Sequence, residues 1–578
     1  MNYAQLISES PQIAALKKYI FGDGITKKFE EEISKNCLKK DLFIIFLSIC
    51  NAKERALVIN GTGATLESAW ENACKKAESL PEKENYNIVW AKADIVNSTE
   101  EILTTDLNME TTVDMHKYFY RKGIALDSNF DTAFLEAELN GYKMIEYYKK
   151  SEAELGRIEH NAVLLKIDSI NRYLKKYYRR RKIKNIPDKI TVFTATGFFC
   201  GENGDVHELY DKGLDYGRRV IDRADSKTIE PVIISAFRYL AGMIQPDGKF
   251  IYGYYPIFYK QMTSYNILRH AGSVWNLINI CRTVNDSEII TKINAAANYL
   301  IDKHIEYKED NIAYVIERKN NEIKLGGNAL AVIMLTEYMD VFKTDKYTDI
   351  VRHLTNGILE LENLEKGTFY HVLNFPDYSP KDKFRTIYYD GEATFALTRA
   401  YTFTKDERYL HGAKMAVENF IAEDYTQYKD QWIAYAMNEI TKYKSDISYY
   451  EFAMKNAVNN LKKIYDIKTT SHIHFELLMA GWQTYKRMTE NSISSEYLDT
   501  ISAENFAKTI YYRAKHMLNG YFYPEFAMYM KYPDKIANTF FIRQDNFRVR
   551  IDDIQHFIGG YYLYSKYYDD IYSNLNIK

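Results

Sequence analysis

Polar and aromatic residues suited to acid–base chemistry recur at the starts of six predicted helices in the second half of the chain. These helices begin SYNILRHAG, LGGNALA, YYDGEATFAL, KDQWIAYAMNE, SHIHFELL and RIDDIQHFIGG. Histidine titrates near neutral pH, carboxyl groups take up and return protons, and arginine binds anions through paired hydrogen bonds. The residues of this set are Tyr265, Asn266, Arg269, His270, Asn328, Asp390, Glu392, Asp430, Trp432, His472, His474, Glu476, Arg550, Asp552 and His556.

Each of these residues also has a structural explanation when it is taken alone. Asp390 and Asp430 can cap their helices, and Arg269 with Asp552 can form a buried ion pair. A single histidine such as His556 is more often a hydrogen-bonded core residue than a catalyst. The set as a whole brings three histidine sites, two arginines and five carboxylates, which helix capping does not require. If the helix starts converge, they predict a pocket for a polar ligand, with helix dipoles that favour anionic groups.

The sequence predicts neither a metal nor a cofactor. His472 and Glu476 lie four residues apart and share a helix face, but the segment lacks the HExxH pattern and a clear third ligand. NGTG at 60–63 lacks the lysine and the spacing of a phosphate-binding loop, and no GxGxxG follows a strand. Neither a GxSxG nucleophile elbow nor a cysteine-protease motif is present.

Six predicted helix pairs position the polar residues. The first helix of each pair carries Lys and Glu, as expected of a solvent-facing outer ring, whereas the second carries the polar start. The weak repeat of about 50–60 residues favours a closed (α/α)6 toroid over an open superhelix, whose repeats are tighter. The predicted pairs are 228–244 with 264–280, 287–305 with 324–342, 347–362 with 388–404, 406–421 with 430–443, 448–465 with 471–488, and 502–518 with 550–568.

The first part of the chain predicts a different fold, an α+β sandwich. FIIFLSIC (43–50) and RALVIN (55–60) are β-rich runs that predict a hairpin, 65–80 has the apolar spacing of a helix, and 87–96 predicts another strand. Pro187 marks a boundary. The predicted organisation is multi-domain, α+β and all-α: an N-terminal α/β sandwich-like domain over 1–185, a linker or docking segment over 186–227, and an (α/α)6 toroid over 228–578.

Composition narrows the class of protein. The 578 residues are too many for one ordinary domain, and the formal net charge of −2 argues against a nucleic-acid binder that works through overall positive charge. Five cysteines without CxxC spacing fit a reducing compartment. The N-terminus lacks a signal-peptide pattern, and the apolar run 42–50 is about half of the ~20 residues that a membrane span needs. We therefore expect a cytoplasmic protein without a membrane span.

The helix pairs and the segments YNILRHAG, YYDGEATFALTRAY and RIDDIQH resemble the (α/α)6-toroid carbohydrate-active enzymes. This superfamily-level likeness covers about residues 228–578. It takes in N-acylglucosamine 2-epimerases, unsaturated glucuronyl hydrolases and the C-terminal domain of glucuronyl C5-epimerases, and it transfers no catalytic residue from any one of them. The resemblance implies acid–base chemistry on a sugar or acidic oligosaccharide, either epimerisation or glycoside hydrolysis or elimination.

Under this resemblance, position in the predicted toroid assigns the expected roles. Histidines are the candidate general acid or base, carboxylates are their partners, arginines hold a uronate or phosphate, and aromatic rings stack on sugar faces. The expected catalytic residues are His270, Asp390, Glu392 and His556. The expected substrate-binding residues are Tyr265, Asn266, Arg269, Asn328, Tyr388, Tyr389, Asp430, Trp432, His472, Glu476, Arg550 and Asp552.

Two other interpretations stay open. A non-catalytic toroid would bind a partner in a polysaccharide biosynthesis or modification assembly, with residues 1–185 as the adaptor. A prenyl- or terpene-processing toroid would need an apolar pocket with a DDxD-type cluster, whereas Asp552 and Asp553 form only a dyad beside Arg550 and His556. Under the carbohydrate interpretation, residues 1–185 recognise a longer glycan or another protein.

Overall fold

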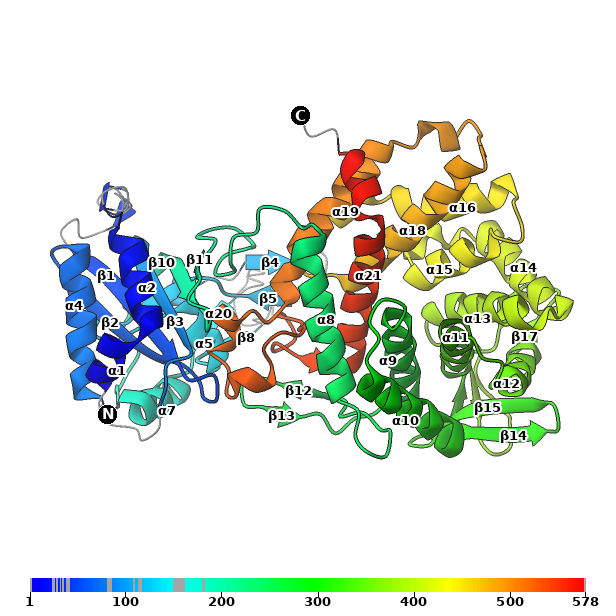
Figure 1. The fold of residues 1–578 in the computed structure, drawn as a ribbon, viewed down its shortest axis with the longest axis horizontal. Coiled ribbons are helices and arrows are strands. Elements are labelled where there is room, and N and C mark those ends of the chain that lie inside the picture. The colour runs from blue at the N-terminus through cyan, green and yellow to red at the C-terminus, as the bar shows by residue number, and fades with distance from the viewer. Residues whose placement is uncertain are drawn as a thin grey trace. The chain divides into compact units, whose positions relative to one another are not determined.

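The chain forms two compact units, each with its own fold (Figure 1). Unit 1 comprises residues 1–222, 254–260 and 519–549, and unit 2 comprises residues 223–253, 261–518 and 550–578. In the part of the chain that is described, no helix is both long and apolar enough to cross a membrane. The structure, a computed structural model, describes residues 3–22, 26, 30, 31, 33, 36, 37, 42–80, 86–107, 110–112, 117–148, 162–178 and 182–575.

Within its described residues, unit 1 is built on a seven-stranded antiparallel sheet in the order β2-β1-β3-β10-β6-β7, with β11 paired to β10. The predicted hairpin is β1 and β2, and Ile45 faces Gly61 across it. β10 lies inside the segment predicted as a linker, yet it pairs with β3 along its whole length. The strands are β1 Phe43–Cys50, β2 Leu57–Gly63, β3 Trp90–Leu103, β6 Gly123–Ala125, β7 Ala133–Phe134, β10 Lys189–Cys200 and β11 Val206–Glu208.

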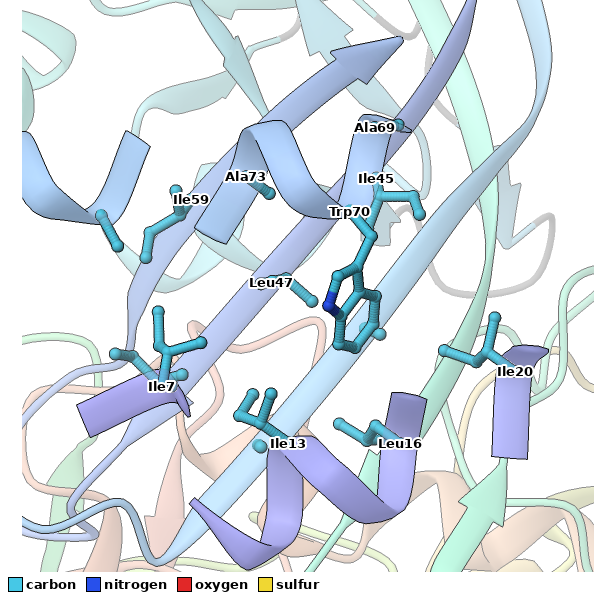
Figure 2. Packing of buried hydrophobic residues seen from close by; sticks show 14 of the residues in the cluster. Ile7, Ile13, Leu16, Ile20, Ile45, Leu47, Ile59, Ala69, Trp70 and Ala73 are labelled. Carbon is cyan, nitrogen blue, oxygen red and sulfur yellow. The ribbon is translucent and has the colours of Figure 1, made fainter. Parts of the chain in front are cut away.

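Helices cover one face of this sheet and bury an apolar core (Figure 2). Successive strand residues point to opposite faces, so Ile45 and Leu47 of β1 share the covered face. Leu16 of α2 and Trp70 of α4 pack into the same core. The remaining described elements of unit 1 are α1 Tyr3–Glu9, α2 Pro11–Phe21, α4 Leu66–Lys76, η1 Ala77–Ser79, η2 Thr104–Asp106, β4 Glu110–Thr112, β5 Lys117–Phe119, α5 Glu136–Gly141, β8 Ile145–Tyr148, β9 Ala162–Leu165, α7 Ile167–Tyr178, α20 Pro524–Ala527 and η6 Pro533–Lys535.

Unit 2 is a closed double ring of helices. Over residues 223–253, 261–518 and 550–575, all of which are described, six inner helices each contact the next, and the last contacts the first. Helix α11 is buried on all sides from Leu325 to Met339, as expected of a helix enclosed by protein. The inner helices are α9 Ile267–Ile280, α11 Leu325–Phe342, α13 Tyr388–Thr404, α15 Gln431–Ile440, α18 His472–Glu490 and α21 Ile551–Ser573.

Six outer helices alternate with the inner ones along the chain and pack against them, which is the arrangement of the predicted (α/α)6 toroid. The polar segment 306–323, between the two helices of the second pair, contains strands of a five-stranded sheet in the order β14-β15-β16-β19-β20. The turn after the last outer helix, residues 519–549, belongs to unit 1. The outer helices are α8 Ser226–Gly242, α10 Ser287–His304, α12 Thr348–Glu360, α14 Glu407–Ala422, α16 Ile447–Val458 and α19 Ala503–Met517.

Short elements complete the chain. They are β12 Gly253–Tyr255, β13 Lys260–Gln261, β14 Ile305–Glu309, β15 Ile312–Glu317, β16 Glu322–Lys324, β17 Glu362–Asn363, β18 Thr368–Phe369, β19 Val372–Asn374, β20 Pro380–Asp382, η3 Tyr425–Tyr428, α17 Leu461–Tyr465, η4 Leu498–Thr500, η5 Leu518–Gly520 and β21 Val549–Arg550.

Ion pairs join the C-terminal parts of four neighbouring inner helices. Arg282, just after α9, binds Glu337 of α11 at 2.6 Å (Nη2–Oε1). Arg399 of α13 contacts Glu337 at 3.2 Å and Glu439 of α15 at 3.6 Å, and Lys442 binds Glu439 at 2.5 Å. Because every charge in this chain of pairs has an opposite charge beside it, the C-terminal end of the ring is electrostatically satisfied.

Replacing Arg399 tests how much this chain of ion pairs stabilises the ring. We expect Arg399→Ala to lower the free energy of unfolding by about 3–5 kcal/mol, because two buried carboxylates each lose a cation. Arg408→Ala removes an exposed pair with Asp406 and should cost less than about 1 kcal/mol. Urea denaturation of both variants measures the difference, and equal losses would contradict a stabilising role for the buried pairs.

Candidate functional site

The N-terminal ends of the inner helices converge at one end of the ring. A Cβ atom at Gly326, in the first turn of α11, would lie under 3.0 Å from side-chain atoms of both Leu268 and Glu392. A Cβ atom at Gly391 of α13 would likewise come under 3.0 Å from the backbone nitrogen of Ile433 in α15. These glycines therefore permit the close approach of neighbouring helix starts. We call this end the mouth, defined by the residues Arg269, Tyr388, Glu392, Asp430, His472, Arg550, Asp552 and His556.

His556 and Glu476 form a charge-assisted hydrogen bond at the mouth. His556 Nδ1 donates to Glu476 Oε2 at 2.6 Å, and the other oxygen of Glu476 accepts from the hydroxyl of Tyr435 at 3.1 Å. With its proton on Nδ1, the neutral imidazole presents the lone pair of Nε2 as a base. Among the described residues Nε2 has no hydrogen-bonding partner, and the side chain keeps 14% of its surface exposed.

The charges around His556 favour its protonated form. Burial acts to lower the pKa of His556, but the carboxylates of Glu476, Asp552 and Asp553 outweigh burial and raise this pKa above its ordinary value. The imidazolium that forms when Nε2 takes a proton is therefore stabilised by its neighbours, as a group that transfers protons requires.

Two glycines on α21 bring His556 to Glu476. A Cβ atom at Gly559 would lie under 3.0 Å from Asn276 of α9 and from Glu476 of α18, and one at Gly560 would lie under 3.0 Å from a side-chain atom of α18. The IGG sequence after His556 thus permits α21 to pack closely against both neighbours. One helical turn earlier, the same face of α21 presents His556.

Two buried carboxyl groups of the mouth each keep an oxygen without a hydrogen-bonding partner. They are Oε2 of Glu392 and Oδ2 of Asp430. The other oxygen of Asp430 caps α15 by accepting from the amide of Trp432 at 2.7 Å. Burial raises the pKa of Asp430 to about 7, helped by the negative charge of Asp390 and opposed by backbone amides. Burial, with the charge of Asp430, also raises the pKa of Glu392 well above its ordinary value, which favours the protonated carboxyl group.

Asp390 is held by His371, a histidine outside the predicted set of site residues. The backbone amide of Arg385 donates to His371 Nδ1 at 2.9 Å, so Nε2 carries the proton and donates to Asp390 Oδ1 at 3.0 Å. Burial raises the pKa of Asp390, and the hydrogen bond from His371 opposes this. The only sequence signal was a histidine within the aromatic turn that precedes α13.

Both arginines of the mouth are paired with aspartates. Arg269 Nε binds Asp552 Oδ2 at 2.8 Å, and Arg269 Nη1 donates to the hydroxyl of Tyr252 at 2.7 Å. Arg550 Nη2 donates to Asp552 Oδ2 at 2.8 Å and to Asp553 Oδ1 at 3.3 Å. The predicted ion pair between Arg269 and Asp552 is thus present, and it is one part of a four-residue network with no net charge.

Aromatic rings border the mouth in two different ways. Trp432 is buried, with its ring 5.7 Å from that of Trp275 and 6.2 Å, edge-on, from that of His556. Tyr388 is exposed, whereas Tyr389 is buried against His371. Of the four aromatic residues expected to stack on a sugar, Tyr388 is therefore the most accessible.

The structure places His270 away from the mouth, which corrects its expected role as acid or base. His270 is fully buried, and its Nε2 donates to the carbonyl of Ala296 in the outer helix α10 at 2.8 Å. Nδ1 accepts from the hydroxyl of Tyr265 at 2.8 Å, so both residues are engaged in packing. Burial lowers the pKa of His270 to about 4. With both nitrogens bonded and the charged form disfavoured, His270 is a structural residue.

Other residues of the predicted set also hold backbone in place. Asn266 caps α9 by accepting from the amide of Leu268 at 2.9 Å. Asn328 is buried, accepts from the amide of Val315 at 2.8 Å and donates to the carbonyl of Lys324 at 2.8 Å. These hydrogen bonds to the backbone account for the presence of both asparagines, and no ligand is needed to explain them.

The two histidines at the start of α18 point in different directions. The ring of His472 lies 5.2 Å from that of His556, and its Nε2 is 3.7 Å from Asp553 Oδ1. His474 Nδ1 instead bonds Ser471 at 2.7 Å, and burial lowers the pKa of His474 to about 4. Among the described residues, no three His, Cys, Asp or Glu side chains are arranged to hold a metal ion.

The buried carboxyl of Asp430 generates a prediction about stability and pH. Its raised pKa means that the folded state binds more protons than the unfolded state between about pH 4 and 7, so the free energy of unfolding falls as pH rises through that window. Asp430→Asn keeps a capping oxygen but cannot ionise. We expect the variant to gain stability relative to the natural chain as pH rises, by up to about 4 kcal/mol at pH 8.

An aspartate with the opposite shift provides the control. Asp446, the exposed N-cap of α16, has its pKa lowered by hydrogen bonds from Ser448, so its ionised form stabilises the fold at higher pH. Asp446→Asn should therefore lose relative stability as pH rises. Denaturation curves between about pH 4 and 8 measure both trends, and parallel trends for the two variants would contradict the burial of a protonated Asp430.

No protein-family profile and no curated protein matches this sequence. Among solved structures, a D-mannose isomerase aligns at 11% identity and a TM-score of 0.45, over 60% of this chain and 99% of its own. A cellobiose 2-epimerase from Bacillus thermoamylovorans aligns at 12% identity and a TM-score of 0.45, over 58% and 98%. The unsaturated glucuronyl hydrolase of Bacillus sp. GL1 aligns at 11% and 0.41, over 57% and 95%. At these identities and TM-scores, no family, activity or catalytic residue follows for this chain.

Proposed function

We propose that unit 2 is a carbohydrate-active enzyme that acts by general acid–base chemistry at its mouth, with His556 as the group that transfers the proton. The observation that carries this proposal is the hydrogen bond of 2.6 Å from His556 Nδ1 to buried Glu476, which leaves Nε2 without a partner among the described residues. A carboxylate that orients a histidine in this way sets its tautomer and stabilises the imidazolium that forms when Nε2 takes a proton.

Epimerisation is the reaction that this arrangement supports best. In the first step, His556 Nε2 takes the proton from the carbon beside the carbonyl of an open-chain sugar, and the bonding electrons move to the carbonyl oxygen. That oxygen takes a proton from an acid, for which the protonated carboxyl group of Glu392 is the candidate. A proton from solvent water, added to the opposite face of the carbon as the oxygen returns its proton to Glu392, inverts that carbon, and His556 releases the first proton to solvent.

Glycoside hydrolysis is the second candidate, favoured by the two unpartnered carboxyl oxygens of Glu392 and Asp430. A protonated carboxylic acid would donate to the departing glycosidic oxygen, and a second carboxylate would activate the attacking water. The two reactions are distinguished in D₂O. Epimerisation places deuterium on a sugar carbon, whereas hydrolysis produces new reducing ends and leaves the carbon-bound hydrogens unchanged.

Replacing His556 tests the proposal directly. We expect His556→Gln to lower turnover of the sugar substrate by about 10²–10⁴-fold, the usual contribution of a positioned acid or base. The matched control is His411→Gln, on the exposed side of outer helix α14. If both variants fold and both retain full turnover, the proposed acid–base role of His556 is wrong and the non-catalytic toroid is favoured.

The pH profile of Glu476→Gln tests the role of the hydrogen bond. Glu476 is the first of the carboxylates that raise the pKa of His556, while burial acts to lower it. Removing the charge of Glu476 should therefore lower this pKa and move the acidic limb of kcat/KM, where His556 becomes the neutral base, to lower pH. An unchanged limb in an active Glu476→Gln enzyme would assign the titration to another group.

The role of residues 1–185 stays as predicted. We keep the proposal that unit 1 recognises a longer glycan or a partner protein, while the chemistry takes place in unit 2.

A further inference from the structure

We infer that the mouth selects a neutral sugar and rejects a uronate or sugar phosphate. This inference rests on the proposed function and corrects the expectation that Arg269 and Arg550 hold an anionic group of the substrate. Three features of the mouth support it: the pairing of its arginines, the compensation of its helix ends and the chemistry of its unpartnered oxygens.

Arg269 and Arg550 already form ion pairs with carboxylates of the protein. Arg269 and Arg550 both bind Asp552, and Arg550 also binds Asp553. A uronate carboxylate would have to compete with a side-chain carboxylate that is held in place by two arginines at once. Displacing Asp552 or Asp553 would leave a buried anion without its partner, which is costly.

Acidic side chains of the protein also lie at the N-terminal, positive ends of several inner helices. Helix N-termini attract anions because their first amides lack partners within the helix. At the mouth, Asp390 lies in the first turn of α13, Asp430 caps α15, and Asp552 and Asp553 lie in the first turn of α21. The chain therefore places its own carboxyl groups at three of the six helix starts, where a substrate anion would otherwise bind.

The unpartnered oxygens favour hydroxyl groups over a carboxylate. Glu392 Oε2 and Asp430 Oδ2 are buried and without hydrogen-bonding partners among the described residues. A sugar hydroxyl can donate to a carboxyl oxygen and can also accept from a protonated carboxyl, whereas an ionised uronate only accepts. A uronate would also repel Asp430 whenever that group is ionised. A neutral polyol is thus the ligand that satisfies these atoms in either protonation state.

The first experiment uses the full-length protein and two matched pairs of sugars, D-mannose with D-mannuronate and D-glucose with D-glucuronate. We expect binding by calorimetry and turnover in D₂O for at least one neutral sugar, with at least tenfold weaker binding of its uronate (a difference of about 1.4 kcal/mol). Tighter binding of the uronate would overturn the inference and leave the proposed function standing. Failure of all four sugars to bind and to turn over would overturn the proposed function as well.

A charge-removing variant tests the physical cause. Asp552→Asn frees Arg269 and Arg550 from their shared carboxylate, so D-mannuronate or D-glucuronate should bind about tenfold or more tightly than to the natural chain, and this gain should shrink at high salt. The control Asp340→Asn removes an aspartate that binds Arg282 beside the C-terminal end of α9, and it should change uronate binding by less than about twofold. Equal effects of the two variants would show that overall charge, and not the paired arginines, determines the selection.

Discussion

Closure of the inner ring by α21 is the constraint on which the rest of unit 2 depends. This last inner helix contacts both α18, its predecessor, and α9, the first inner helix, and it also packs against the outer helix α8. Because Gly559 and Gly560 carry no Cβ atom, α21 approaches these neighbours closely enough for His556 to reach Glu476. The same residues that close the fold therefore assemble the group proposed to transfer the proton, and ring closure and function cannot be separated at this helix.

The acidic side chains at the two ends of the ring differ in whether they have partners. At the C-terminal end, Arg399 lies between two carboxylates and every charge in the chain of pairs is matched. At the mouth, by contrast, buried carboxyl oxygens of Glu392 and Asp430 stay unpartnered. Unsatisfied buried groups lower stability, and when they occur in a cluster they point to a site that a ligand completes. Arg399 Nε at the C-terminal end is also buried without a hydrogen-bonding partner, so the contrast concerns the carboxyl oxygens, and these support the proposal that the mouth is the functional end.

The sequence predicted the ring well because helix periodicity and turn composition are local signals. Eleven of the twelve predicted helices agree with the observed ones to within five residues, whereas the helix predicted over 448–465 ends at Val458 and is followed by the separate helix α17. Strands also occupy the polar segment 306–323 between the helices of the second pair. The helical register also explains the error at His270. Gly272 faces the interior beside Gln555, and His270, two residues earlier, lies about 200° away around the helix. The position of a residue along α9 correctly identified the end of the helix that lies at the mouth. Which side chains at that end face the mouth depends on how α9 is rotated about its axis.

Other features depended on contacts between distant parts of the sequence. His371 reaches Asp390 from a turn, which no helical period can indicate. Strand β10, within the predicted linker, is recognisable as a strand by its β-branched and aromatic residues, but its pairing with β3 is a long-range contact. Residues 519–549 follow the last outer helix in sequence, yet they belong to unit 1. Local sequence patterns therefore predicted helices and strands. Which unit a connecting segment belongs to depends on long-range contacts, which only the structure shows.

The buried carboxyl groups of the mouth destabilise the fold, and this supports the proposed chemistry. Ionisation of buried Asp430 and Glu392 is disfavoured by burial, and a polar group left unpartnered inside a protein destabilises the folded state. Replacing Glu392 by an apolar residue would remove that cost, so a purely structural ring would gain stability without this acid. A ligand rich in hydroxyl groups offsets the cost by supplying the missing hydrogen bonds. Under the proposed function, the acids serve two purposes, because the carboxyl groups proposed to bind a neutral sugar are also proposed to exchange protons with it.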